Sequence, residues 1–314
     1  MSANYTNNHS IPLSLAVWLA SDFYDGKSSN QKQLSATSLL RSPRQIVLGQ
    51  RVLGSEGQTD LMELVPSRMG TAIHDSIEKA WTESDLNKIF ESLGYPSSVA
   101  ENIKINPLPG SVLDDDIPIY MEQRSFKEIN GWKISGKFDF VVEGQVQDFK
   151  RTGTYTYVKG SNDEKYCQQG SIYRWLNQDI ITDDHMAIQF IFTNWSALQA
   201  TIEKDKGYPQ HRVMSKKIKL MSLEETELFI RKKLTLIESI STMPEENLPF
   251  CTKEELWQDE PKYKYYKNPD KRQRSTKNFD SLSDANKRLT DDGNVGVVVT
   301  DHGAAKACKW CSGL

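Results

Sequence analysis

The sequence has no hydrophobic run long enough to cross a membrane. Its most apolar early stretch, residues 11–20, is interrupted by Pro12 and Ser14, whereas a membrane-spanning helix needs about 20 apolar residues. No basic residue precedes that stretch, which argues against a secretory signal. We therefore predict a cytoplasmic protein with no membrane partner.

Cysteine is also scarce, and the chain has no excess of positive charge. Four cysteines in 314 residues argue against the disulfide framework of a small secreted protein. The net charge of −3 excludes a chain that is basic over its whole surface, so any contact with nucleic acid must come from local patches. The hydrophobic content of 38% and the charged content of 26% are those of a folded globular chain.

The hydrophobic period changes along the chain and divides it into three segments. These are an N-terminal helical segment (1–66), a core (67–243) and a C-terminal basic and cysteine-containing module (244–314). Inside the core, helical spacing gives way to strand-like alternation after Ile117 and returns after the strands. Helices are therefore expected on both sides of a sheet, chiefly over residues 70–81, 83–93, 163–177 and 221–240.

The strands of the core are marked by two tight reversals. Asn130-Gly131 favours a two-residue hairpin turn, and Gly144 marks a second reversal. A further run, residues 185–194, is apolar on both faces and reads as a buried strand. The pattern predicts an α/β (or α+β) fold, in which helices flank a central mixed sheet with an antiparallel meander over residues 117–129, 132–143 and 145–150.

Two acids and a lysine are expected on neighbouring strands of this meander. Side chains at positions i and i+2 of a strand share a face, so Asp148 and Lys150 point the same way while Phe149 points to the other side. The turn at Gly144 brings Asp139 alongside Asp148. Two carboxylates so placed repel each other unless a cation lies between them, and oxygen ligands suit Mg²⁺ or Mn²⁺. Lys150 then orients water or stabilises charge at a phosphate.

The alternative is that these are charges on the solvent face of a strand. A D-x-K triplet is common by chance, and Asp163-Glu-Lys165 is another example in this chain. Glu122, on the first strand of the meander, could add an acid to the site, but we expect a surface charge there.

The combined motifs resemble the PD-(D/E)XK nuclease superfamily, in particular its RecB-type branch, which includes CRISPR-associated adaptation nucleases and many phage exonucleases. The similarity covers residues 35–195 and implies a restriction-endonuclease-like core. Asp139, in Gly136-Lys-Phe-Asp139, and Asp148 and Lys150, in Asp148-Phe-Lys150, resemble the two acids and the lysine of the motif. By the same resemblance His74, in Thr71-Ala-Ile-His74, is a third metal ligand, and Gln169 and Tyr173 are helix residues that position substrate and lysine.

The function implied is that of a Mg²⁺- or Mn²⁺-dependent deoxyribonuclease, with an exonuclease favoured over an endonuclease. The partners expected are single-stranded DNA or duplex ends, and a homo-oligomer or a recombination partner protein is left open. A role in phage or host DNA processing, in the host cytoplasm if the protein is viral, follows from the resemblance alone. The alternatives are a non-catalytic DNA-binding or assembly protein that keeps the fold, and a metal-binding interaction module centred on the C-terminal segment.

The cysteines leave three alternatives for metal binding open. Some relatives in this branch bind an iron–sulfur cluster through one early cysteine and three late ones, but the corresponding early stretch has Ser42 here. Cluster binding needs four strong ligands, and Cys167 supplies a fourth only if its helix lies near the C-terminal module. A zinc site from Cys251, His302, Cys308 and Cys311 is the second alternative, and the absence of any metal is the third and the one we expect.

A run of cations and tyrosines lies between those cysteines. Its composition suits single-stranded DNA, because cations pair with phosphates and bases stack on tyrosines. The alternative is a solvated loop. The residues predicted to contact DNA are Lys262, Lys264, Tyr265, Lys267, Arg272 and Arg274.

Overall fold

The computed structural model describes residues 5–21, 32–52 and 58–311 and divides the chain into two compact units. Unit 1 comprises residues 1–40 and 55–238, and unit 2 comprises residues 41–54 and 239–314. In the described residues, no helix is both long enough and apolar enough to span a bilayer.

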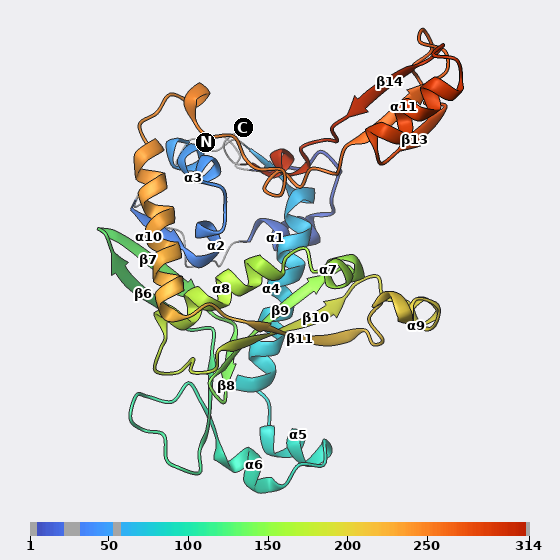
Figure 1. Ribbon diagram of the computed structural model, residues 1–314. Coiled ribbons are helices and arrows are strands. Elements are labelled where there is room, and N and C mark those ends of the chain that lie inside the picture. Colours follow the sequence, from blue (N-terminus) through green and yellow to red (C-terminus); the bar gives the residue numbers. More distant parts are fainter. Residues whose placement is uncertain (1–4, 22–31, 53–57, 312–314) are drawn as a thin grey trace. The chain divides into compact units, whose positions relative to one another are not determined.

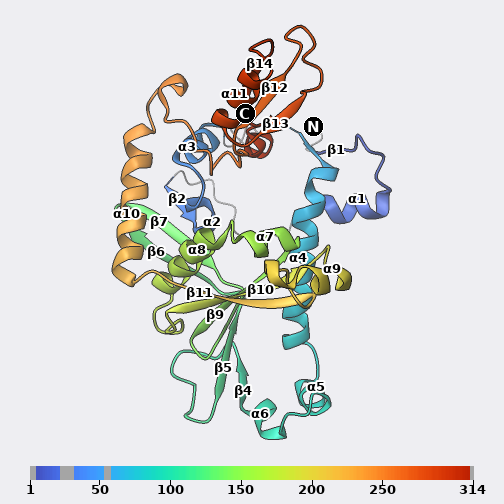
Figure 2. The ribbon, with the colours of Figure 1, turned by 45° about the vertical axis from the view of Figure 1, so that its right-hand side comes forward.

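Unit 1 is built on a six-stranded mixed sheet, whose strands lie side by side in Figure 2. The β9–β10 and β4–β5 pairs are parallel, and the β10–β11, β8–β9 and β5–β8 pairs are antiparallel. The mixed α/β architecture predicted from the sequence is therefore confirmed. The order across the sheet is β11 (Val213–Lys219), β10 (His185–Phe192), β9 (Gln145–Thr152), β8 (Phe140–Val142), β5 (Ile117–Met121) and β4 (Ile103–Ile105).

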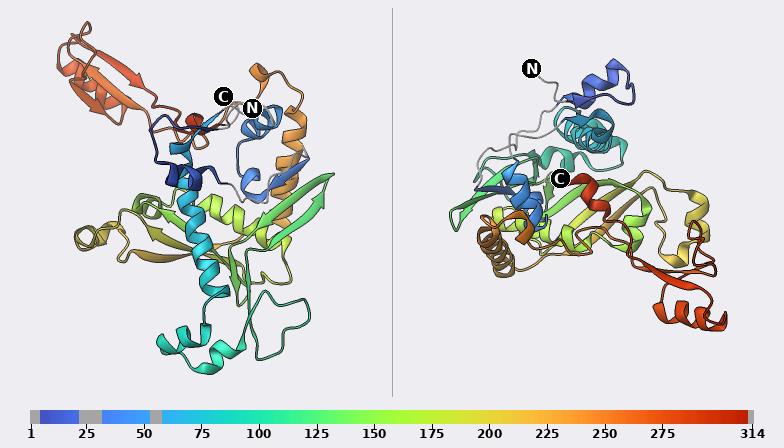
Figure 3. Two further views of the ribbon diagram at one scale, coloured as in Figure 1. Left: turned by 180° about the vertical axis from the view of Figure 1, so that it is seen from behind. Right: turned by 90° about the horizontal axis from the view of Figure 1, so that it is seen from above.

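A second sheet, of three strands, contains the outer half of the hairpin predicted over residues 117–143. Figure 3 shows β2 (Gln33–Ser35, blue) alongside β7 (Trp132–Lys137) and β6 (Arg124–Ile129), both green. β6 and β7 are antiparallel and joined at Asn130-Gly131, as the turn signal predicted. The predicted long hairpin therefore exists, but its outer half belongs to this sheet and its inner half, β5 and β8, belongs to the six-stranded one.

Helices cover both faces of the six-stranded sheet (Figure 1). Along β9, Val146 and Asp148 are buried on the side of α8, whereas Gln147 and Phe149 face a pocket that α4 also lines. The helices of unit 1 are α1 (Leu13–Ala20), α2 (Ala36–Leu39), α4 (Leu61–Thr82), α5 (Leu86–Ser92), α6 (Ser97–Asn102), α7 (Thr154–Lys159), α8 (Asp163–Leu176), α9 (Ala197–Ile202) and α10 (Leu223–Ile240).

The helix α4 begins nine residues before the predicted start at Gly70. Asp60 caps it by accepting a hydrogen bond from the Met62 N–H at 3.0 Å, and Asp60 also accepts one from the Asn8 N–H at 2.9 Å. It belongs to β3 (Thr59–Asp60), which pairs in parallel with β1 (Tyr5–Thr6). A side-chain cap of this kind contributes about 1 kcal/mol to helix stability.

Unit 2 joins α3 (Pro43–Arg51) to the C-terminal segment, so its boundaries differ from the predicted segments. The Arg44 guanidinium donates hydrogen bonds to the carbonyl oxygens of Glu245 and Leu248, at 3.1 and 3.0 Å. Arg51 donates to the Ser241 carbonyl oxygen at 3.0 Å. Residues 41–52, assigned by the sequence pattern to the N-terminal segment, are thus held by the chain that follows α10.

Unit 2 also contains a small sheet of three antiparallel strands. Tyr265 is fully buried between this sheet and α11 (Leu282–Asp291), whose Ala285 is also fully buried. The strand order is β13 (Lys277–Phe279), β12 (Lys262–Tyr266) and β14 (Val297–Asp301).

Candidate metal centre

The candidate site lies in unit 1, where the long hairpin passes from one sheet to the other. The break falls at Glu122 and Gln123 on one arm and at Phe138 and Asp139 on the other. The Glu122 N–H still donates to the Asp139 carbonyl oxygen at 3.1 Å, so the arms stay joined. Glu122 has φ +52°, a left-handed conformation that costs a non-glycine residue on the order of 1 kcal/mol. Such irregularities re-aim side chains, and this one places Glu122 near Asp139.

His74, on α4, faces both of these acids. Its Nε2 lies 3.0 Å from the Phe149 carbonyl oxygen, and it donates there because a carbonyl oxygen can only accept. Its Nδ1 lies 3.4 Å from Asp139 Oδ1 and 4.0 Å from Glu122 Oε1. The bond to Phe149 thus fixes the ring and leaves Nδ1 as the ligand atom, the arrangement typical of histidines that bind metals.

Asp139 connects this group to β9. Its Oδ2 accepts a hydrogen bond from the Phe149 N–H at 2.9 Å while its Oδ1 faces His74. His74, Glu122 and Asp139 each present one ligand atom, and these atoms all lie within 4.8 Å of one another. A divalent cation with bonds of about 2.1 Å needs ligand atoms about 3–4 Å apart, and the distances from His74 Nδ1 to the two acids, 3.4 and 4.0 Å, are in that range.

Asp148 lies on the adjoining strand. Phe140 pairs with Gln147, so continuing the antiparallel register sets Asp139 opposite Asp148, as the turn at Gly144 predicted. Asp148 is only 1% exposed, and Lys150 Nζ lies 2.6 Å from its Oδ2. That oxygen accepts no hydrogen bond of normal geometry from the described residues. Asp148 is therefore a buried carboxylate whose charge is balanced chiefly by one ammonium group.

The pKa values follow from burial and from the excess of negative charge. The hydrogen bond to Asp139 raises the pKa of His74 to about 8, although burial opposes the rise. Burial raises the pKa of Asp148 and of Glu122, and Lys150 and Lys137 respectively oppose these shifts. For Lys150, burial lowers the pKa, but the carboxylates of Asp148 and Asp139 outweigh it and raise it overall. Lys150 is therefore a fixed positive charge at neutral pH.

The helix α8 closes the site on the other side of β9. A Cβ on Gly136 would lie 2.9 Å from the Tyr173 ring and 2.7 Å from Leu176 Cδ1, so the glycine of the predicted GxxD motif allows α8 to approach β7. Gln169 donates to the Tyr173 hydroxyl oxygen at 2.7 Å. Tyr173 is 4% exposed, and burial raises its pKa well above the ordinary value. The two helix residues singled out from the sequence therefore contact each other in the interior.

Glu122 is the residue that the sequence interpretation misjudged. It was expected to be a surface charge, but its side chain is 17% exposed and forms an ion pair with Lys137 at 2.7 Å. The predicted ligands were His74, Asp139 and Asp148, whereas the close group consists of His74, Asp139 and Glu122. Strand alternation predicts which face of the hairpin Glu122 lies on and nothing more. The backbone break that turns it towards His74 has no signal in a single sequence.

We expect Glu122→Gln to weaken Mn²⁺ binding by about 10- to 100-fold, the range found when a residue that supports a metal site is removed. The amide keeps the size of the side chain but removes the negative charge that faces His74 and Lys137. Calorimetric titration of the purified protein with Mn²⁺ measures the change. Glu128→Gln is the matched control, because Glu128 is an exposed acid on β6 of the same hairpin. Equal affinities of the two variants would exclude a role for Glu122 at the metal.

A second acid–histidine group lies at the start of β10. Asp183, Asp184 and His185 are consecutive residues, and His185 Nδ1 lies 2.5 Å from Asp184 Oδ1. Asp184 is 55% exposed, and Asp183 accepts hydrogen bonds from the His185 N–H and from Gln145. These bonds account for the group as a surface turn, and among the described residues no buried carboxylate adjoins it as Asp148 adjoins the first group.

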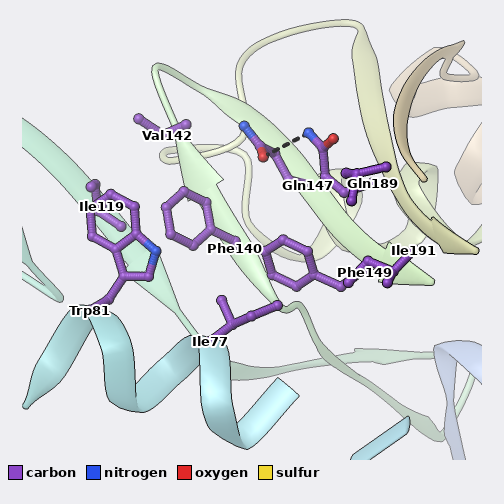
Figure 4. A pocket seen from close by; sticks show the side chains of 10 residues that line it. Ile77, Trp81, Ile119, Phe140, Val142, Gln147, Phe149, Gln189 and Ile191 are labelled. Carbon is purple, nitrogen blue, oxygen red and sulfur yellow. Dashed lines mark hydrogen bonds between the residues drawn. The ribbon is translucent and has the colours of Figure 1, made fainter. Parts of the chain in front are cut away.

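An apolar pocket of about 470 Å³ lies between α4 and the sheet (Figure 4). Phe149 belongs to both the pocket and the site, because its ring meets His74 edge-on at 6.0 Å while its backbone bonds to His74 and Asp139. Gln189 donates to Gln147 Oε1 at 3.0 Å across the pocket wall. No charged side chain of the described residues lines the pocket, so it offers no positive charge to a phosphate.

The cysteine residues fall in both units. In unit 2, Ser42 is 2% exposed and its Oγ lies 3.2 Å from Cys251 Sγ. The position at which the resemblance would place a cysteine is therefore adjacent to Cys251. Among the described residues, no three of Cys251, His302, Cys308 and Cys311 bring their ligand atoms within 4.8 Å of one another. The four residues of the zinc alternative thus do not form a closed tetrahedral set, and Cys167 lies on α8 of unit 1.

The basic run is arranged differently from the prediction. Lys262 forms an ion pair with Asp280, and Lys264 forms one with Asp301 at 2.6 Å. Tyr265 is completely buried, and its hydroxyl donates to Asp292 at 2.8 Å. The prediction that Tyr265 stacks on a base is corrected accordingly, because β12 is the central strand of its sheet and Tyr265 points into the core. Lys267, Arg272 and Arg274 remain exposed.

Comparison with known proteins adds little. No known family matches the sequence, and no curated protein matches it. A solved structure described as "Crystal structure of SSO0001" is similar over 67% of this chain and 79% of that chain, with 14% identity and a TM-score of 0.39.

Proposed function

We propose that this protein is a metal-dependent deoxyribonuclease with a restriction-endonuclease-like core, and that it degrades DNA from its ends. The observation that supports the proposal best is the buried Asp148–Lys150 pair beside the group of His74, Glu122 and Asp139. Burying a carboxylate beside a second one, Asp139, is costly when one ammonium group balances the charge, and a bound cation would reduce that cost. The preference for DNA ends depends on the resemblance of the motifs to RecB-type exonucleases.

Each residue has a distinct role in this proposal. His74 Nδ1, Asp139 and Asp148 would hold Mg²⁺ or Mn²⁺, with Glu122 beside them. Such a cation supplies a Lewis acid and lowers the pKa of bound water. Lys150 contributes a positive charge next to the carboxylates, where it stabilises the negative charge that develops on a phosphate during hydrolysis. Tyr173 packs on Gly136 of β7, and Gln169 fixes the Tyr173 hydroxyl from within α8.

We expect the purified protein to degrade linear DNA with Mg²⁺ or Mn²⁺ and to leave covalently closed circular DNA intact. EDTA should abolish degradation, because hard oxygen and imidazole ligands hold the cation that the reaction requires. End-labelled linear duplexes, single strands and closed circles, separated on gels over time, give the readout. Cleavage of the circles would overturn the exonuclease assignment. DNA binding without cleavage under any of these metal conditions would favour a non-catalytic DNA-binding protein instead.

A further inference from the structure

The connection between β12 and β13 carries a concentrated positive charge. Residues 267–277, called the basic hairpin below, contain five cations and a single acid, Asp270, which is a net charge of +4 in a chain whose overall charge is −3. The five cations are Lys267, Lys271, Arg272, Arg274 and Lys277.

These five side chains differ from the lysines that precede them on β12. All five are exposed, and none of them forms an ion pair with a described residue, whereas Lys262 and Lys264 are neutralised by Asp280 and Asp301. Arg272 donates from Nε to the Pro269 carbonyl oxygen, so the outer nitrogen atoms of its guanidinium group remain available. The acids of unit 2 therefore neutralise the strand and leave the hairpin charged.

The basic hairpin is held in place by its own hydrogen bonds. The Thr276 N–H donates to the Tyr265 carbonyl oxygen at 2.8 Å, and the Lys267 N–H donates to Thr276 Oγ1 at 3.0 Å. Ser275 Oγ donates to Asn278 Oδ1 at 2.6 Å. Because Tyr265 is fixed in the core, the ends of the hairpin are anchored. The cations are thus presented from a folded support, which lowers the entropy lost when a ligand binds.

We propose that the basic hairpin binds the phosphate backbone of DNA and does not read its bases. The proposal rests on the proposed deoxyribonuclease function and adds the surface that holds the substrate. Five exposed cations that form no ion pair with a described residue match a polyanion, and sequence-independent binding to DNA depends on such contacts. The hairpin contains no aromatic residue. On the adjoining strands Tyr265 and Tyr266 are buried, and Tyr263 and Phe279 are half-buried. The hairpin itself therefore offers no ring for base stacking, the usual basis of a preference for single strands.

The test is the triple variant K271Q/R272Q/R274Q, compared with K88Q/K204Q/K206Q, which removes the same charge from exposed lysines of unit 1. Binding to fluorescent single strands and duplexes of unrelated sequence is measured in EDTA at several salt concentrations. We expect the hairpin variant to bind all of them more weakly and the salt slope on duplex DNA to fall by about 3, one for each phosphate that is no longer neutralised. The control should retain the wild-type slope. Equal slopes for the two variants, or weakening confined to one base composition or to single strands, would overturn the proposal.

A cleavage assay distinguishes DNA binding by the basic hairpin from the proposed nuclease activity on which the inference depends. Both variants should cleave a short oligonucleotide at the wild-type rate when it is saturating, because neither alters the metal centre. Thermal unfolding should show the same midpoint for all three proteins, which excludes misfolding as the cause of weak binding. If the wild type does not cleave DNA at all, the nuclease proposal fails while the salt slopes still test the hairpin. If the wild type cleaves and the hairpin variant keeps the full slope, the hairpin inference alone fails.

Discussion

Lys150→Met should reduce the rate of DNA cleavage by about 10³-fold, the loss found when one group that stabilises transition-state charge is removed. Methionine keeps the length and the apolar stem of the side chain but removes the ammonium group, which lies 2.6 Å from Asp148 Oδ2. Metal affinity should stay the same or rise, because Asp148 no longer pairs with a competing cation. Single-turnover cleavage and Mn²⁺ titration together distinguish this outcome from simple loss of the metal.

Lys165→Met is the matched control for that experiment. Lys165 is the lysine of the second D-x-K triplet, Asp163-Glu-Lys165, at the start of α8. In that triplet Asp163 is bound by Lys216 at 2.5 Å, so the same sequence pattern there serves an ion pair between elements. Cleavage by Lys165→Met should equal that of the wild type. Comparable losses in the two lysine variants would mean that general charge, and not the position of Lys150, determines the rate.

The sequence was sufficient to place the elements that carry the site. Asn130-Gly131 and Gly144 both adopt positive φ angles at the predicted reversals, and the resulting register sets Asp139 beside Asp148. The glycine of the GxxD motif also has a visible reason, since Tyr173 and Leu176 occupy the space that a Cβ would need. These features depend on local turn chemistry and on strand alternation, which a single sequence records directly.

Glu122 and Tyr265 could not be placed in the same way. Glu122 enters the site because the hairpin changes sheets at that residue and its backbone adopts φ +52°, a tertiary effect that overrides alternation. In the basic run, the mixture of lysines and tyrosines gave no indication that β12 is the central strand of a sheet. A strand that alternates buried tyrosines with ion-paired lysines contains the same residue types as a surface on which bases stack. The burial of Tyr265 and the ion pairs of Lys262 and Lys264 with acids distant in sequence separate the two interpretations.

Asp139→Asn should reduce both Mn²⁺ affinity, by at least about 100-fold, and cleavage. An asparagine Oδ1 can still accept the Phe149 N–H, so the contact with β9 is kept while the charge that faces His74 is removed. Asp183→Asn is the control, because it removes the same charge from the group of Asp183, Asp184 and His185 at the start of β10. Loss of metal-dependent cleavage in Asp183→Asn, with full activity in Asp139→Asn, would move the metal centre to β10.

The pKa of His74 and the stability of the metal-free protein test Asp139→Asn independently of metal binding. Asp139 is the main cause that raises the pKa of His74 from 6.5 to about 8, so the NMR titration of His74 in Asp139→Asn should shift towards the ordinary value. A histidine whose pKa is raised by folding stabilises the native state fully below pH 6.5, and this contribution is lost as the pH rises through 8. The variant should therefore be destabilised more at about pH 6 than at about pH 9. A pH-independent loss of stability would mean that Asp139 acts through Phe149 and not through His74, which would leave the imidazole without the carboxylate partner that the metal centre requires.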